Sequence, residues 1–377
     1  MAKYRFGDIV REVKDKVDRD NNPYEYYIAG DHMDTDELHL LRRGAFEGSD
    51  VGPAFIRIFK PGQVLYGSRR TYLRKVAVAD FEGVTANTTF VLESKDETIL
   101  LQSLLPFIMQ ADRFVQHSIK RSKGSTNPYV LFSDLADYEV NLPSIEEQRK
   151  LSDLLWAIDG VKMSYKKLIS ATDDLVKSQF IEMFGNPLTN DKRWPTKKMK
   201  EVAPSSPHTS KIEKKNNGYW LLNLDMVESN SGRIIEKIYV PEDEIGQSTT
   251  TFSKEYVLYS KLRPYLNKVV IPNDSGYATT ELIPLLPNQR LLTQLYLAQL
   301  LRGDEFLTYI STQVSGTKMP RVTMNVFWDF NVMLPPMELQ EQFAEFVRQS
   351  DKSKFELEQA LSELTATYKR IISDNLG

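Results

Sequence analysis

The sequence predicts an α+β protein with two similar mixed α/β domains, joined by a long antiparallel two-helix coiled coil with pseudo-twofold symmetry. Three observations support this fold class. The chain of 377 residues repeats itself after about 190 residues, a period too long for a solenoid unit. A long stretch with heptad spacing follows each copy. Hydrophobic residues make up 41% of the chain, which is enough to form globular cores.

The composition excludes several classes of protein. The chain contains no cysteine, so structural disulfides, cysteine-ligated zinc, iron–sulfur clusters and thiol nucleophiles are ruled out. The N-terminal segment lacks the apolar core of a signal peptide, and no apolar run is long enough to span a bilayer. We therefore expect a cytoplasmic protein without membrane partners. The net charge of −3 means that any contact with nucleic acid must depend on local basic patches.

The internal repeat is clearest in one segment. Residues 64–76 and 257–269 are 193 positions apart and are identical at eight of thirteen positions, which include Val-Leu-Tyr and Tyr-Leu. A later pair, residues 124–130 and 316–322, matches at an offset of 192. A slip of one residue indicates a single loop insertion or deletion. The chain therefore contains two tandem copies of one module.

A long helix is predicted after the first copy, over residues 145–184. Ser144 and Glu147 have the spacing of a capping box, and Gly185 supplies the stop. Forty helical residues would extend about 60 Å. The predicted heptad stripe consists of Leu154, Ile158, Val161, Tyr165, Leu168, Thr172, Leu175 and Gln179, widened on one side by Leu155, Ile169, Val176 and Met183.

The second copy ends in a similar amphipathic stretch. Its stripe consists of Phe343, Phe346, Ser350, Ser353, Leu357, Ala360, Leu364 and Ile371, with Leu361 and Tyr368 beside them. We expect the two stripes to pack against each other; the alternative is that each helix packs on its own globular domain. The predicted domains are residues 1–143, 144–187, 188–335 and 336–377, where the second and fourth are helical.

Shorter elements are expected in the globular parts. Residues 55–59, 76–79, 234–240 and 268–272 have the β-branched and aromatic composition of strands. Residues 100–117 and 291–314 have helical patterns.

Catalytic motifs are absent or weak. The sequence contains no phosphate-binding Gly-x-x-x-x-Gly-Lys, no nucleophile elbow and no His-Glu-x-x-His. Asn-Pro-Tyr at 22–24 and 127–129 lacks the second proline of an adenine methyltransferase. Asp80, Glu93 and Lys95 only faintly match a nuclease pattern. A group that could ligate a metal is better interpreted as a solvated loop: His32, Asp34, Asp36, Glu37 and His39. We predict no catalytic, cofactor or metal site.

A basic, tyrosine-containing pattern recurs in both copies and predicts binding. Arginine side chains suit guanine or phosphate, lysines suit phosphate, and aromatic rings can stack or fill a groove. Salt bridges for Arg70 and Lys75, and a core position for Tyr72, are the alternatives. The candidate DNA-binding residues are Arg69, Arg70, Tyr72, Arg74, Lys75, Lys120, Arg121, Lys123, Ser125, Lys261, Arg263, Tyr265, Lys268, Thr317, Lys318 and Arg321.

A resemblance follows from the motifs that close each module. Both carry Gly-Ser/Thr-x-x-Pro and then Leu-Pro-x-x-Glu-x-Gln, at residues 142–148 and 334–340, before the long helix. This arrangement resembles the DNA-specificity subunit of Type I restriction–modification systems over essentially the whole chain. The two copies differ within these motifs. Glu147 of the first copy corresponds to Leu339 of the second, Asn127 to Met319, and Tyr129 to Arg321.

The resemblance implies a non-catalytic role. Residues 1–143 and 188–335 would be target-recognition domains, each reading one half of a bipartite double-stranded DNA site, and the helices would act as a spacer ruler. It also implies two methyltransferase subunits that use S-adenosylmethionine, and an endonuclease subunit using ATP and Mg²⁺ where one exists; this chain itself would hold no cofactor. Two alternatives remain: a self-sufficient methyltransferase or nuclease, and a coiled-coil adaptor without DNA binding.

Overall fold

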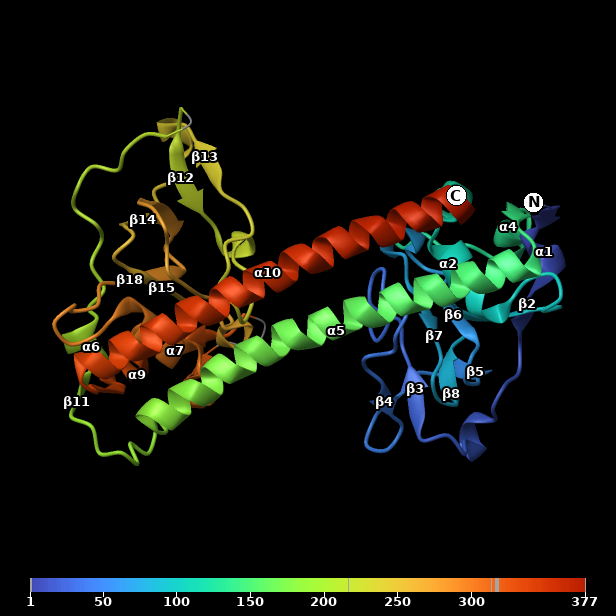
Figure 1. Cartoon of the computed structure of the whole chain (residues 1–377). Coiled ribbons are helices and arrows are strands. Elements are labelled where there is room, and N and C mark those ends of the chain that lie inside the picture. Colours follow the sequence, from blue (N-terminus) through green and yellow to red (C-terminus); the bar gives the residue numbers. More distant parts are fainter. Residues whose placement is uncertain (1, 216, 313, 316–318, 377) are drawn as a thin grey trace. The chain divides into compact units, whose positions relative to one another are not determined.

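The computed structural model describes residues 2–215, 217–312, 314–315 and 319–376 (Figure 1). The chain forms two compact units. The first comprises Met1–Lys166 and Gln359–Gly377, and the second comprises Lys167–Glu358. Each unit therefore contains one globular domain with the adjoining halves of two long helices.

The first unit contains two four-stranded sheets, with strand orders β2-β9-β6-β7 and β4-β3-β8-β5, and a separate β1-β10 pair. Strand β3 runs parallel to β8, and the other pairings are antiparallel. The elements are β1 (Ala2–Arg5), α1 (Phe6–Ile9), β2 (Val10–Val13), η1 (Arg19–Asn21), β3 (Tyr26–Ile28), β4 (Gly44–Ala45), β5 (Phe55–Phe59), β6 (Val64–Gly67), η2 (Thr71–Leu73), β7 (Val76–Val78), β8 (Gly83–Ala86), β9 (Thr89–Ser94), η3 (Gln102–Leu104), α2 (Leu105–Gln110), α3 (Asp112–Arg121), α4 (Phe132–Ala136) and β10 (Glu139–Leu142).

The second unit repeats this plan. Its sheet β13-β12-β17-β14 has the order of β4-β3-β8-β5, with β12 parallel to β17. The elements are β11 (Thr196–Lys198), α6 (Met199–Val202), β12 (Tyr219–Leu222), η4 (Leu224–Met226), β13 (Ile238–Val240), η5 (Glu242–Glu244), β14 (Thr249–Phe252), β15 (Val257–Ser260), η6 (Pro264–Leu266), β16 (Val269–Val270), β17 (Gly276–Thr279), β18 (Leu282–Leu285), α7 (Gln294–Arg302), α8 (Asp304–Ser311), β19 (Val314–Ser315), β20 (Arg321–Val322), α9 (Met324–Asp329) and β21 (Asn331–Met333).

Two helices of forty residues each, α5 (Ile145–Phe184) and α10 (Met337–Leu376), continue from the domains. The predicted capping box is present, because the amide of Ser144 donates to Glu147 Oε2 at 2.9 Å and the amide of Glu147 donates to Ser144 Oγ at 3.4 Å. Gly185 follows the last helical residue with φ of +80°, the left-handed conformation that the predicted stop requires. The predicted fold class is confirmed.

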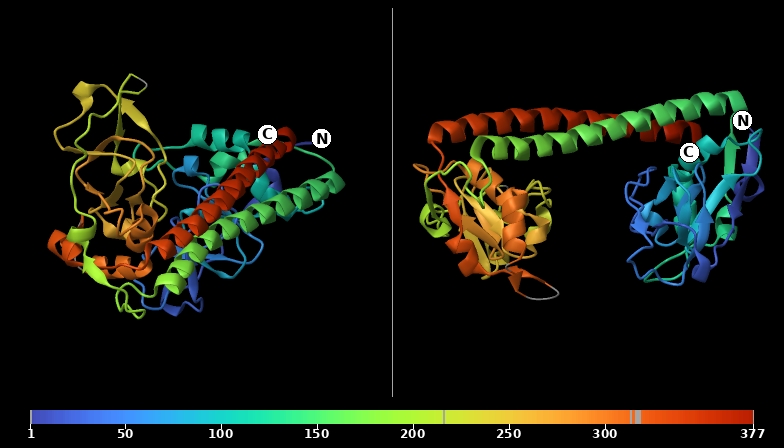
Figure 2. Two further views of the ribbon diagram at one scale, coloured as in Figure 1. Left: turned by 60° about the vertical axis from the view of Figure 1, so that its left-hand side comes forward. Right: turned by 90° about the horizontal axis from the view of Figure 1, so that it is seen from below.

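The two helices run antiparallel within each unit, and Figure 2 shows them side by side. In the first unit the Lys162 ammonium lies 4.1 Å from the centre of the Tyr368 ring, so the first half of α5 meets the last part of α10. In the second unit the rings of Phe180 and Phe343 lie 5.6 Å apart, so the end of α5 meets the start of α10. Each domain core contains residues of both long helices, the start of one and the end of the other. The alternative, in which each helix packs only on its own domain, therefore describes only part of these contacts.

The predicted contact stripe of α5 is only half right, because Ile158, Tyr165, Thr172 and Gln179 are half-buried and the other four members are exposed. Leu154, Val161, Leu168 and Leu175 are 46–52% exposed, whereas the flanking Leu155 and Val176 are buried in the two domain cores. The two domain cores cover the side of the helix next to this row, which leaves the row exposed along the helix. The exposed row of Leu154, Val161, Leu168 and Leu175 is called the outer row below.

Several shorter predictions are corrected as well. Residues 55–59 and 76–78 are strands, but only residues 238–240 of the predicted strand 234–240 pair, and 268–272 is reduced to 269–270. The helix predicted over 100–117 divides at Ala111, and that over 291–314 divides at Gly303, because both residues have extended or non-helical dihedral angles. The predicted domain boundaries stay predictions.

Candidate nucleic-acid interface

The most closely repeated local structure is a tight turn between two strands of each domain. In the first unit it runs from β6 through Arg70, the 3-10 helix η2 and Arg74 into β7; in the second, Arg263, η6 and Asn267 link β15 to β16. The residues that flank each 3-10 helix have φ between 47° and 50°. Non-glycine residues seldom adopt this left-handed conformation, and it recurs here at matched positions. We call these two segments, residues 68–75 and 260–268, the paired turns.

Each paired turn is fixed to the second basic segment of its domain. The Arg70 amide donates to the carbonyl of Pro128 at 2.6 Å, and the Arg263 amide donates to the carbonyl of Pro320 at 2.7 Å. Isolated bridges join Arg69 to Tyr129 and Leu262 to Arg321. The structure therefore brings together the two sequence segments that were predicted separately. Thr317 and Lys318 lie outside the described residues.

Several candidate cations are held by partners within the protein. Arg74, whose side chain is 20% exposed, pairs with Asp36 and Asp112. Burial alone would lower the pKa of Arg74, but these two carboxylates outweigh it and raise the pKa. Lys75 donates to the carbonyl of Gly30. Arg74 and Lys75 are therefore held within the fold, although Lys75 bonds a carbonyl and not the carboxylate of the salt bridge considered for it.

The same holds for candidates around the second segments and the second turn. Lys123 pairs with Asp134 at 2.9 Å, and Arg321 pairs with Glu281 at 3.0 Å. Lys268 donates to the carbonyl of Leu224 at 2.7 Å, and its burial lowers its pKa. Arg121 lies 3.9 Å from Asp137, at the limit of an ion pair.

A smaller set is left available to an external ligand. Within the part of the chain that the structure describes, no carboxylate lies within ion-pair distance of this set, unlike the paired cations above. The Arg263 side chain is half-buried, and its Nε is buried without a hydrogen-bond partner. The set comprises Arg69, Arg70, Lys120, Lys261 and Arg263, to which the exposed Ser125, Tyr72 and Tyr265 add hydroxyl groups. The core position considered for Tyr72 is wrong.

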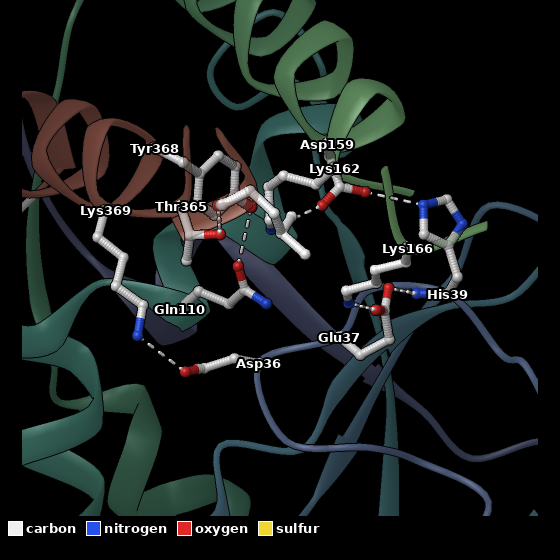
Figure 3. Close-up of polar contacts among 11 residues, drawn as sticks. Asp36, Glu37, His39, Gln110, Asp159, Lys162, Lys166, Thr365, Tyr368 and Lys369 are labelled. Atoms are coloured by element: carbon white, nitrogen blue, oxygen red, sulfur yellow. Dashed lines mark hydrogen bonds and ion pairs between the residues drawn. The ribbon is translucent and has the colours of Figure 1, made fainter. Parts of the chain in front are cut away.

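The loop with histidine and carboxylates is solvated only in part, which corrects the sequence interpretation. Glu37 is 4% exposed and pairs with Lys166 of α5, and His39 Nε2 lies 2.8 Å from Asp159 Oδ2 (Figure 3). Ligand atoms of Glu37, His39 and Asp159 lie within 4.8 Å of one another, a spacing open to a metal ion. However, Lys166 and Lys162 already supply positive charge to Glu37 and Asp159. The cluster joins the first domain to α5.

The other weak catalytic patterns also have structural partners. Glu93 accepts hydrogen bonds from Arg11 and Gln63, and Lys95 donates to the carbonyl of Gly7. In the first Asn-Pro-Tyr segment, the Tyr24 amide donates to Asn22 Oδ1 at 3.0 Å. These hydrogen bonds give Glu93, Lys95 and Asn22 structural roles within the fold.

The His39–Asp159 contact predicts a pH dependence of stability. The hydrogen bond that His39 donates to Asp159 raises the pKa of His39 above its usual 6.5, and burial only partly opposes it. A group with a raised pKa contributes its full stability below 6.5 and loses it as the pH rises through the folded-state pKa. We expect the melting temperature of the wild type, relative to His39→Gln, to fall as the pH rises from 6 to 8. Parallel melting curves across this range would contradict the prediction.

Sequence reasoning missed the role of a buried glutamine at the start of each long helix. Gln148 Oε1 accepts from the Leu101 amide at 3.1 Å, and its Nε2 donates to the carbonyl of Ile99 at 2.8 Å. Gln340 repeats both contacts with Thr293 and Leu291, each at 2.9 Å. The recurrence of Glu-x-Gln was the available signal, and its function is to fasten the helix to its domain.

Two α/β domains with matched basic turns, each fastened to long helices, define a modular binding protein. The chain belongs to the family described as the Type I restriction modification DNA specificity domain, whose sequence model matches residues 7–171 and 191–365. The family model matches once in each repeat, and it confirms the resemblance found in the sequence.

Individual relatives agree with this family. The chain is 23% identical to the Type I restriction enzyme EcoDI specificity subunit of Escherichia coli over 61% of its length and 59% of the relative's. It is also 23% identical to the HindI specificity subunit of Haemophilus influenzae, over 48% of its length and 40% of the relative's. The matches thus span about half the length of these relatives.

A solved structure shows the same fold. The crystal structure of the Type I restriction–modification S subunit from M. genitalium aligns with a TM-score of 0.54 at 13% identity, covering 100% of this chain and 96% of that one. Among the described residues, no helix is both long and apolar enough to cross a membrane.

Proposed function

We propose that this chain reads a bipartite sequence in double-stranded DNA without catalysing a reaction, one half-site for each domain. The observation that carries the proposal is the duplicated turn, which presents Arg70 and Arg263 in the same rare backbone conformation. An arginine side chain can bind guanine O6 and N7 or a phosphate with two hydrogen bonds. Neither side chain is committed to a carboxylate among the residues that the structure describes.

The net charge of −3 does not oppose this function, because the five cations named above lie on the paired turns or on a neighbouring segment and can form a local basic surface. Phosphate contacts from Lys120 and Lys261 would supply affinity, and base contacts from the arginines would supply sequence preference. The two turns differ at several positions, including Arg69 against Leu262 and Thr71 against Pro264. We therefore propose that the two half-sites have different sequences.

We also propose that the chain serves as a scaffold for methyltransferase subunits. The outer row on α5 exposes four apolar side chains at intervals of seven residues, the spacing that a helix of another protein would cover. In this proposal, S-adenosylmethionine binds to the methyltransferase subunits, and ATP with Mg²⁺ to an endonuclease subunit where one is present.

Selection of bound duplexes from a random pool tests the proposed DNA function. The purified full chain should enrich two short conserved blocks separated by an unspecified spacer of fixed length. Its affinity should fall steeply with salt because bound phosphates release counterions. Enrichment of one continuous block, or retention that is independent of sequence and salt, would contradict the proposal.

The repeat supplies an internal control for the arginines. Arg263→Ala should weaken binding by about 1–3 kcal/mol and relax base preference in one half-site only. Arg70→Ala should do the same in the other half-site. Binding would be measured by fluorescence anisotropy on duplexes that are mutated in one half-site at a time. If both variants keep full preference at both half-sites, the arginines are structural.

A further inference from the structure

We propose that Tyr72 and Tyr265 are the constant contacts of the two half-sites: each ring packs against the sugars and base edges of the duplex and contributes affinity without reading sequence. This inference rests on the proposed DNA function and assigns a mode of contact to one residue in each turn.

The two tyrosines are exposed to an equal extent. The side chain of Tyr72 is 52% exposed and that of Tyr265 is 54% exposed. The neighbouring tyrosine of the same repeat behaves in the opposite way in both copies, since Tyr66 and Tyr259 are 3% and 4% exposed. The repeat thus separates one tyrosine used for the core from one that faces solvent. Exposing half of a large ring forgoes burial energy, and both domains do so at the same position.

The backbone that carries each ring is closed by the same hydrogen bond in both copies. The Leu73 amide donates to the carbonyl of Arg70 at 2.8 Å, and the Leu266 amide donates to the carbonyl of Arg263 at 2.9 Å. Each 3-10 turn is therefore closed by a hydrogen bond around its tyrosine. A backbone held in this way loses little conformational entropy when the turn meets a ligand.

The residue that follows each 3-10 helix differs between the copies, but its side chain makes the same kind of contact. Arg74 donates to the carbonyl of Gln110 at 2.6 Å, and Asn267 donates to the carbonyl of Arg302 at 2.8 Å. Gln110 and Arg302 end the equivalent helices α2 and α7. The supporting side chain differs between the copies, but the position of the tyrosine does not. The geometry therefore preserves the placement of the ring.

The chemistry of the side chain indicates a contact that is neutral to sequence. An aromatic ring, unlike the fork of an arginine side chain, has no paired hydrogen-bond donors that could read a base edge. Sugars are alike along the duplex, so ring contacts with them tolerate changes of sequence. Arg70 and Arg263, two positions before each tyrosine, can bind base edges while the ring packs against the adjacent sugars.

The test uses the full chain and the duplex obtained by selection. Tyr72→Ala should lower affinity about tenfold on the selected duplex and by the same factor on duplexes with single changes in the first half-site, so that discrimination stays constant. Tyr72→Phe should bind as the wild type does, because the ring and not the hydroxyl makes the contact. Tyr265→Ala should give the same result for the second half-site. Melting temperatures should not change.

Each other outcome has a distinct meaning. Unchanged affinity of Tyr72→Ala, altered preference at one base pair, or an equal loss in Tyr72→Phe would overturn the inference while leaving the DNA function intact. If the alanine variant melts early, Tyr72→Leu replaces it, since leucine retains apolar bulk without a flat ring and should still lose affinity. A wild-type chain without bipartite preference would instead overturn the proposed function.

Discussion

Asp159→Ala is expected to destabilise the first unit by about 3–5 kcal/mol. Asp159 is 3% exposed and accepts from Lys162 Nζ at 3.2 Å and from His39 Nε2 at 2.8 Å. Burial alone would raise the pKa of Asp159, but the bonds from His39 and Lys162 outweigh it and lower the pKa. Without the carboxylate, the buried ammonium of Lys162 has lost its partner, and an unpaired buried charge is costly. Urea unfolding of wild type and variant measures the difference.

Two matched variants separate this mechanism from a general effect of the substitution. Asp153 lies on the same helix and is exposed, so Asp153→Ala should change stability by no more than about 0.5 kcal/mol. The double variant Asp159→Ala/Lys162→Met removes both charges and should recover much of the lost stability. If the double variant is as unstable as Asp159→Ala, the unpaired charge of Lys162 is not the cause.

The two domains are fastened to their helices by ion pairs of opposite polarity. In the first unit Lys166 of α5 pairs with Glu37 of the domain, and in the second Glu358 of α10 pairs with Arg233 at 3.1 Å. Lys166 and Glu358 occupy matched positions on the two helices, 192 residues apart. The fold thus keeps the junction and exchanges the charges. An alignment of the repeat by identity could not find this relation.

The parts of the fold that sequence predicted best are those encoded by neighbouring residues. The bounds of α5 were predicted because Ser144, Glu147 and Gly185 act within a few residues of the helix ends. The earlier helix, predicted over 100–117, breaks at Ala111, where no glycine or proline stands, so the sequence pattern gave no warning of the break. Propensity is local, whereas that break depends on the core around it.

The candidate site shows the same division. The paired turns were found because the repeat preserves their sequence, and the exposure of Tyr72 and Tyr265 depends on that turn. Whether a cation is free depends on carboxylates far along the chain: Arg74 pairs with Asp112, and Arg321 pairs with Glu281. A single sequence does not show which distant charges meet. For this reason several basic residues were predicted to bind DNA although they form ion pairs within the protein.

Phe184→Ala is expected to cost about 3–5 kcal/mol, and the loss should be confined to the second unit. Phe184, the last residue of α5, is fully buried, and its ring lies 4.8 Å from Tyr296 and 5.3 Å from Phe343. Alanine would leave a cavity where the end of α5, the start of α10 and the domain helix α7 meet. Because this cluster belongs to the core that includes Val257 and Tyr259 of β15, the strand before the second paired turn should lose protection.

Amide hydrogen exchange tests this with the repeat as its own control. In Phe184→Ala, exchange should accelerate in β15 and stay unchanged in the equivalent β6 of the first unit. Phe355→Ala provides the matched substitution, since Phe355 lies on α10 in the same unit but is 58% exposed, and should leave both strands protected. Equal acceleration in β6 and β15 would show that the long helices transmit the loss from one unit to the other, and would contradict the prediction that each domain is stabilised by its own helix ends.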